Sequence, residues 1–159
     1  MTDMNHVGVT VPDIDAAIDW YVKVMGLTLL EGPLHCDLTT KGGDRRANVF
    51  GDHWGRMKLA HLLTSNGAGL ELVQFLEPAV VTPEDNFPYF QVGPHHLAFT
   101  VDDFHTTLAA ILENGGRQRS QIFDVNDGEF ICYCDDPWGN VVEIVSKSYS
   151  HLAAATAVT

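Results

Sequence analysis

Positively charged residues are scarce in this chain. Its 159 residues contain nine Lys plus Arg against 21 Asp plus Glu, which gives a formal net charge of −12 at pH 7. So acidic a surface repels the phosphates of nucleic acids and of anionic lipids over most of its area. We therefore expect no nucleic acid and no membrane among the partners of this protein.

Long apolar runs are also lacking. No stretch approaches the roughly 18 to 20 apolar residues that span a bilayer. Residues 1–6 lack the basic start and apolar stretch of a signal peptide, which predicts a cytoplasmic location. With 45% hydrophobic residues, a chain of this length can bury a substantial core, and we expect a single domain over residues 1–159.

Cysteine is rare and has no Cys-x-x-Cys spacing. The three cysteines are Cys36, Cys132 and Cys134, and this number and spacing predict no disulfide framework. Cys132 and Cys134 flank Tyr133 in a strand-like run. Because neighbouring strand positions face opposite sides of a sheet, we interpret both cysteines as small buried residues rather than as metal ligands.

What the chain does contain is an internal repeat. The segment His-Val-Gly-Val-Thr-Val-Pro-Asp at 6–13 aligns without a gap with His-Leu-Ala-Phe-Thr-Val-Asp-Asp at 96–103. Each copy is a strand-like run that ends in an acidic turn. Each is followed by a helical pattern that closes at glycine, at Gly26 in the first copy and at Gly115 in the second.

Three further strand-like runs follow each predicted helix, so each half is predicted to be a β-α-β-β-β module. The runs are 27–31, 57–63 and 70–76 in the first half and 121–125, 129–134 and 141–145 in the second. The fold class is therefore α+β. We place the modules at 3–77 and 94–148, the connector between them at 78–93, and a C-terminal tail at 149–159. Residues 32–55 are too many for a structureless link and predict a strand extension or a loop over a site.

Four polar residues occupy equivalent places in the two halves. His6 and His96 begin the first strand of each module, and Glu71 and Glu143 lie among apolar neighbours in the last. Taken singly, each has an ordinary structural interpretation, as a hydrogen-bonded histidine or a solvent-facing glutamate. Their repetition favours a shared site, because two imidazoles and two carboxylates can hold one divalent ion such as Zn, Ni, Co, Mn or Fe.

Nearby polar residues are assigned by strand parity. His95 must point away from the face that His96 occupies, and the repeat selects His96. Gln74 has the opposite parity to Glu71 and is interpreted as a surface or hydrogen-bonding residue. His61, on the neighbouring strand, could serve as a general base, but we prefer the interpretation as a core or surface histidine.

With these residues identified, the chain resembles the vicinal oxygen chelate superfamily. This group includes glyoxalase I, methylmalonyl-CoA epimerase, fosfomycin and bleomycin resistance proteins, and extradiol dioxygenases. The resemblance runs from about 6 to 145 and is carried by Gly-Pro-His-His-Leu-Ala-Phe-Thr-Val-Asp-Asp at 93–103 and Asp-Asp-Pro-Trp-Gly-Asn at 135–140. It implies a cupped mixed sheet of two βαβββ modules, one divalent metal ion per site and a homodimer. The residues His6, Glu71, His96 and Glu143 match the four-ligand pattern of bacterial glyoxalase I.

The resemblance also implies a class of reaction. Such proteins bind a small molecule through vicinal oxygens, and the metal stabilises an enolate or another oxyanion. Our first hypothesis is a metal-dependent isomerase or lyase, similar to lactoylglutathione lyase or to the epimerase, that moves a proton next to a carbonyl. In this hypothesis Glu143 or Glu71 also acts as the base. The alternatives are an extradiol-type Fe(II) dioxygenase, which needs only one glutamate beside His6 and His96, and a metal-free drug-binding resistance protein.

Two details of the resemblance concern the substrate. Glutathione-dependent glyoxalases are expected to supply basic contacts to the peptide carboxylates, and the candidates here are Arg45, Arg46, Arg56 and Lys58. The third-strand glutamate base of the epimerase has no match, since Lys58 and His61 occupy that strand.

Overall fold

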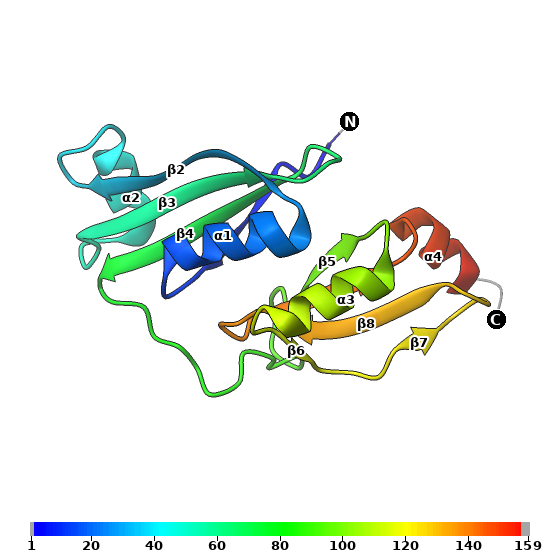
Figure 1. The fold of residues 1–159 in the computed structure, drawn as a ribbon. Helices are drawn as coiled ribbons and strands as arrows, with labels where there is room; N and C mark the ends of the chain where they lie inside the picture. The colour runs from blue at the N-terminus through cyan, green and yellow to red at the C-terminus, as the bar shows by residue number, and fades with distance from the viewer. Residues whose placement is uncertain (1, 157–159) are drawn as a thin grey trace. The chain divides into compact units, whose positions relative to one another are not determined.

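The described residues fold into two compact units. The computed structural model describes residues 2–156, and the chain divides into its units between Thr82 and Pro83 (Figure 1). This boundary falls inside the predicted connector at 78–93. Each unit contains its own sheet and its own helices, and each is described by itself below.

The first unit is a four-stranded mixed sheet with two helices. Its sheet has the order β1-β4-β3-β2, with β1 parallel to β4 and the other neighbours antiparallel. The elements are β1 (His6–Thr10), α1 (Ile14–Met25), β2 (Thr28–Asp37), α2 (Gly43–Phe50), β3 (Arg56–Leu63) and β4 (Gly69–Glu77).

Helix α1 begins and ends at the predicted residues. The carboxylate of Asp13 accepts hydrogen bonds from the backbone N–H groups of Asp15 and Ala16, which satisfies donors that have no partner within the helix. Gly26 ends the helix in the left-handed conformation, with φ of 70°. The buried face of α1 packs on the sheet and consists of Ile14, Ala17, Ile18, Trp20, Tyr21 and Val24. Gln74 supports the helix start, because its side chain bonds Ile14 N–H and the Pro12 carbonyl, as expected of a hydrogen-bonding residue.

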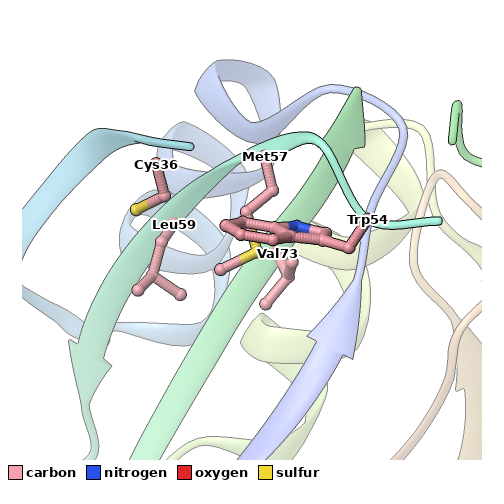
Figure 2. Close-up of a cluster of buried hydrophobic side chains, with 5 residues drawn as sticks. All are labelled: Cys36, Trp54, Met57, Leu59 and Val73. Atoms are coloured by element: carbon pink, nitrogen blue, oxygen red, sulfur yellow. The ribbon is translucent and has the colours of Figure 1, made fainter. Parts of the chain in front are cut away.

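The segment 32–55 contains both the strand extension and a helix. Strand β2 continues to Asp37 through a bulge at Gly32 and Pro33, and α2 follows. Below α2 lies a buried apolar cluster of Cys36, Trp54, Met57, Leu59 and Val73, shown in Figure 2. Ala47 of α2 packs against this cluster, and Phe50 contacts the rings of Trp54 and Phe75. Tertiary packing of its apolar side therefore holds this short helix in place.

The second unit repeats the plan with a broken second strand. Its elements are β5 (Leu97–Thr100), α3 (Phe104–Glu113), β6 (Arg117–Gln118), β7 (Phe123–Asp124), β8 (Phe130–Asp135), β9 (Val141–Val145) and α4 (Tyr149–Thr156). The sheet order is β5-β9-β8-β6, and β7 also pairs with β8. Of the strand predicted at 121–125, only Phe123–Asp124 is a strand, and β6 precedes the predicted range. The C-terminal tail contains α4, and residues 157–159 lie outside the described part.

The central hairpins of the two units have matching registers. In the first unit Ala60 lies opposite Leu72 and His61 opposite Glu71. In the second unit Cys132 lies opposite Ile144 and Tyr133 opposite Glu143. The parallel strands match as well, since Gly8 pairs with Glu71 and Ala98 with Glu143. The repeat seen in the sequence therefore extends to the pairing of the strands.

The cysteines are buried, but our argument from opposite faces was wrong. Cys132 and Cys134 are two positions apart and therefore share a face of β8, with their sulfur atoms 3.9 Å apart. Both are fully buried, at positions equivalent to Ala60 and Leu62 of the first unit. Burial, followed by the neighbouring thiol of Cys132, raises the pKa of Cys134 to about 12. These thiols are packing residues, as expected.

The fold class and the order of elements agree with the sequence prediction, whereas α2 and α4 were not predicted individually. Among residues 2–156, no helix has the length and apolar character needed to span a membrane.

Candidate functional site

The second unit brings one predicted histidine to one predicted glutamate. His96 immediately precedes β5, and its Nε2 lies 3.3 Å from Oε2 of Glu143 on β9. The Glu143 side chain is only 14% exposed. Two donor atoms that each lie about 2.1 Å from a shared divalent ion are roughly 3.0–3.5 Å apart at octahedral to tetrahedral angles. The separation in the structure therefore suits two ligands of one metal ion.

The first unit places its own pair on one face of the sheet. His6 lies opposite Gly69, and Gly8 lies opposite Glu71, on the parallel strands β1 and β4. Oε2 of Glu71 lies 3.8 Å from the point where a Cβ on Gly8 would stand. A Cβ on Gly69 would stand only 2.9 Å from Cβ of His6. The two glycines therefore leave room on this face for the imidazole and the carboxylate.

Both histidines are held through the same ring nitrogen. A hydrogen bond of 2.6 Å joins Nδ1 of His6 to Oδ1 of Asn5, and one of 2.8 Å joins Nδ1 of His96 to Nδ1 of His95. Histidine ligands of metal ions are commonly fixed in this way, with one nitrogen hydrogen-bonded and the other directed to the ion. His95 itself packs against the ring of Phe87.

Each glutamate faces a second polar side chain across its hairpin. Nδ1 of His61 lies 3.8 Å from Oε1 of Glu71, and the His61 side chain is 39% exposed. In the second unit Tyr133 takes the equivalent position beside Glu143, and its ring lies 5.3 Å from that of His96. Burial raises the pKa of Tyr133, and the charge of Glu143 and a hydrogen bond to it raise it further.

Tyr133 was missed by the sequence reasoning. The signal was available, because the matching hairpins place Tyr133 where the first unit has His61. His61 was noticed but interpreted as a residue without a catalytic role. The structure places it next to a predicted ligand, on the wall of a cavity.

The connector forms part of the second unit's site. Phe87 contacts the ring of Tyr133, and the guanidinium of Arg119 lies 4.9 Å from the Phe87 centroid. Arg119 bonds Asp135 and Asp85, and hydrogen bonding to Asp135, the largest effect, raises its pKa. These contacts fix an aromatic wall beside the His96–Glu143 pair.

A cavity of about 600 Å³ lies in the first unit, between β2, β3 and the start of α2. A volume of this size is typical of small-molecule pockets, which span roughly 300–1,000 Å³. Its lining residues are Glu31, Leu34, His35, Cys36, Thr40, Lys41, Gly42, Arg45, Arg46 and His61.

The four predicted ligands are divided between the units, with one His–Glu pair in each. Within residues 2–156, no group of three or more His, Cys, Asp or Glu side chains is close enough to hold a metal ion. A four-residue metal site composed of His6, Glu71, His96 and Glu143 therefore stays a prediction.

Comparisons with known proteins identify the family of this chain. The family model of the Glyoxalase/Bleomycin resistance protein/Dioxygenase superfamily matches residues 3–144. A glyoxalase family protein from Bacillus cereus has a similar structure, with 20% sequence identity and a TM-score of 0.74 over 91% of this chain and 93% of that one. For a glyoxalase/dioxygenase from Nostoc punctiforme the identity is 25% and the TM-score 0.59, over 90% and 89% of the two chains.

Glyoxalase I from Zea mays is also similar, with 21% identity and a TM-score of 0.61. This match covers 91% of the present chain but only 44% of the maize chain. No curated protein matches the sequence. The structural likenesses establish the fold, and the family match spans most of both units and all four predicted ligands. The chain therefore belongs to the glyoxalase/bleomycin resistance protein/dioxygenase superfamily, as its internal repeat and its His and Glu positions led us to expect.

Proposed function

We propose that this protein is a divalent-metal-dependent isomerase or lyase that moves a proton next to a carbonyl group of a small substrate. One observation carries the proposal. Each unit has a histidine at the start of its first strand or directly before it and a glutamate in its last strand, and in the second unit their donor atoms are 3.3 Å apart. Such pairing matches the needs of a metal ligand set and has no evident use in packing.

The residues that would hold the ion are His6, Glu71, His96 and Glu143. Their nitrogen and oxygen donors suit Zn, Ni, Co, Mn or Fe(II). A bound ion supplies Lewis-acid polarisation of a carbonyl oxygen, which makes the neighbouring C–H more acidic.

The glutamates are the candidate bases. The side chains of Glu143 and Glu71 are 14% and 29% exposed, so each carboxylate is partly shielded from water but still accessible to a small substrate. In this proposal one carboxylate oxygen takes the proton from the carbon next to the carbonyl and returns it to a neighbouring atom. His61 and Tyr133 face these carboxylates and can orient them by hydrogen bonds.

The presence of two glutamates separates this proposal from its rivals. A ring-cleaving dioxygenase needs one carboxylate beside two histidines, so that a second would occupy a position required by O₂ or the catechol. A drug-binding resistance protein without a metal requires none of the four residues.

The test combines metal analysis with isotope exchange. We expect protein purified without chelator to contain close to one divalent ion per chain. We also expect it to exchange the α-proton of a substrate with D₂O in the absence of oxygen. The substrates to screen by proton NMR are the hemithioacetal of methylglyoxal and glutathione, and methylmalonyl-CoA. The Glu143→Gln and Glu71→Gln variants should retain most of the metal, and the one that removes the base should lose on the order of 10²-fold in turnover.

Glu113→Gln is the matched control, because Glu113 is an exposed residue at the end of α3 and should leave both measurements unchanged. Full metal occupancy in a His96→Ala, Glu143→Ala double variant would refute the site. Oxygen uptake stoichiometric with ring opening of a catechol would identify the protein as a dioxygenase.

A further inference from the structure

A buried carboxylate in the second unit is held by two arginines. Asp135, the last residue of β8, is 2% exposed. Its Oδ2 accepts hydrogen bonds from Nε and Nη2 of Arg117, and its Oδ1 accepts one of 2.7 Å from Nε of Arg119. Leu63 occupies the equivalent register position of the first unit, so the fold accepts an apolar residue there. Because a buried ion pair seldom stabilises a fold more than apolar packing does, the charge of Asp135 indicates a role beyond stability.

Arg119 extends from this buried carboxylate to the connector. Its Nη2 lies 3.0 Å from Oδ1 of Asp85, and its guanidinium carbon lies 4.9 Å from the centroid of the Phe87 ring. The same oxygen of Asp85 accepts a hydrogen bond from Phe87 N–H. A guanidinium can bond two carboxylates and stack on a ring at the same time, because it is planar and has five donors. Arg119 therefore links the connector to a fixed point of the sheet.

Phe87 contacts both side chains that support the predicted ligands of this unit. Its ring centroid lies 5.7 Å from that of His95 and 6.4 Å from that of Tyr133. His95 is hydrogen-bonded to His96 through the two Nδ1 atoms, and Tyr133 lies opposite Glu143 and bonds its carboxylate. A displacement of the Phe87 ring would therefore reach the imidazole and the carboxylate through their immediate neighbours.

We infer that Arg119, anchored by Asp135, is a positioning residue for the pair formed by His96 and Glu143. It acts through Phe87, whose ring it keeps against the two supporting side chains. Ligands that are already oriented bind an ion more tightly, because less conformational freedom is lost on binding. The consequence for metal binding rests on the proposed function, whereas the effect on the metal-free pair does not.

The test compares two arginine variants at one carboxylate. Arg119→Gln removes the link to the connector. Arg117→Gln is the matched control, because it removes the other arginine from Asp135 and its side chain is 71% exposed. Each variant leaves Asp135 paired with one arginine and should fold, as circular dichroism will verify.

The first readout is the imidazole ¹⁵N spectrum of the metal-free full chain, with His96 assigned by its loss in His96→Gln. We expect Arg119→Gln to shift the His96 nitrogen signals and to increase amide hydrogen exchange at 85–90, and Arg117→Gln to change neither. The exposed hydrogen bond between Asn86 and Asn140 remains, so the connector should loosen rather than detach.

The second readout is zinc affinity, measured by competition with a chromophoric chelator. Loss of a group that directly supports a ligand costs roughly 10–100-fold in affinity, and Arg119 acts one contact further away, so we expect a loss of roughly threefold to tenfold in Arg119→Gln. Phe87→Leu should cause a similar loss. The double variant should bind zinc no more weakly than Phe87→Leu alone, because both residues act along one path.

Three results would overturn the inference. The first is a loosened connector with unchanged His96 signals in Arg119→Gln, and the second is an equal shift of those signals in Arg117→Gln. The third is additive losses in the double variant, because Arg119 would then act by a route other than Phe87. If the wild type binds no zinc, the proposed function fails, and the metal-free spectra still decide whether Arg119 positions His96.

Discussion

A single methyl group at Gly69 tests whether the position of His6 matters for the metal. Gly69 lies opposite His6, and a Cβ at this position would stand 2.9 Å from Cβ of His6. Carbon atoms in good contact are about 3.5–4.0 Å apart, so the imidazole or its strand must move by at least about 0.6 Å. Gly69→Ala therefore displaces a predicted ligand without changing any ligand.

The expected effect on stability is small. Overpacking costs about 1–3 kcal/mol in a closed core, but His6 is exposed and can move, which places the cost at the lower end. Replacement of glycine by alanine in a strand stabilises the folded state by about 0.5–1 kcal/mol, because the unfolded chain has less conformational entropy. The free energy of unfolding should therefore change by less than about 1 kcal/mol. Metal affinity should fall by on the order of tenfold, as when the support of a ligand is removed.

Gly8→Ala is the matched control. A Cβ there would meet only Oε2 of Glu71, at an ordinary contact distance of 3.8 Å, and the second unit already has Ala98 at the equivalent position. Zinc affinity is measured by competition with a chromophoric chelator, and stability by urea unfolding. If Gly69→Ala and Gly8→Ala bind zinc as tightly as the wild type, His6 is not a ligand whose position the sheet fixes. A loss of affinity in Gly8→Ala alone would likewise refute the reasoning.

Two further predictions concern the helix cap and the assembly. Asp13→Ala removes the acceptor for Asp15 and Ala16 N–H and should lower the free energy of unfolding, measured in urea, by about 1 kcal/mol. Asp19→Ala, on the exposed side of α1, should change it by less than about 0.5 kcal/mol, and equal losses in the two variants would contradict the capping role. We also propose a homodimer, and sedimentation at micromolar concentration should give twice the chain mass of 17.5 kDa, so that a monomer alone would exclude it.

Periodicity and turn residues predicted most of the fold. Apolar spacing and caps placed α1 and α3, because Asp13 and Asp103 satisfy the first N–H groups and glycine ends α1. Alternation placed the strands of both central hairpins, and Asp127 and Gly128, with φ of 45° and 95°, form the predicted turn before β8. These signals are local, so the sequence displays them directly.

The unpredicted elements depend on distant contacts. Helix α2 begins with Gly-Asp-Arg-Arg and has no apolar stripe of useful length, and it is stabilised by packing of Ala47 and Phe50 on side chains from other segments. The second strand of the second unit is interrupted between β6 and β7, where Ser120 forms hydrogen bonds to Tyr133 of β8. Its hydroxyl accepts a hydrogen bond from Tyr133 N–H, while Arg119 and Ser120 N–H both bond the Tyr133 carbonyl. Strand propensity contains no information about such bonds.

The candidate site was predictable where the repeat is faithful and not where the halves differ. The repeat placed a histidine and a glutamate in each unit, but it did not indicate what faces them. The second unit has Val141 at the position equivalent to Gly69. Strand β5 of that unit begins at Leu97, so His96 lies just before the strand, whereas His6 is the first residue of β1. The two histidines therefore have different neighbours on the last strand, glycine in the first unit and valine in the second.

The same difference extends to the surroundings of the two glutamates. Glu71 faces His61, whereas Glu143 faces Tyr133, which contacts the ring of Phe87, and the Glu143 side chain is about half as exposed as that of Glu71. A charged group of a ligand would keep more of its hydration beside Glu71 than beside Glu143. If the proposed chemistry holds, the Glu71→Gln and Glu143→Gln variants should therefore differ in their effect on turnover.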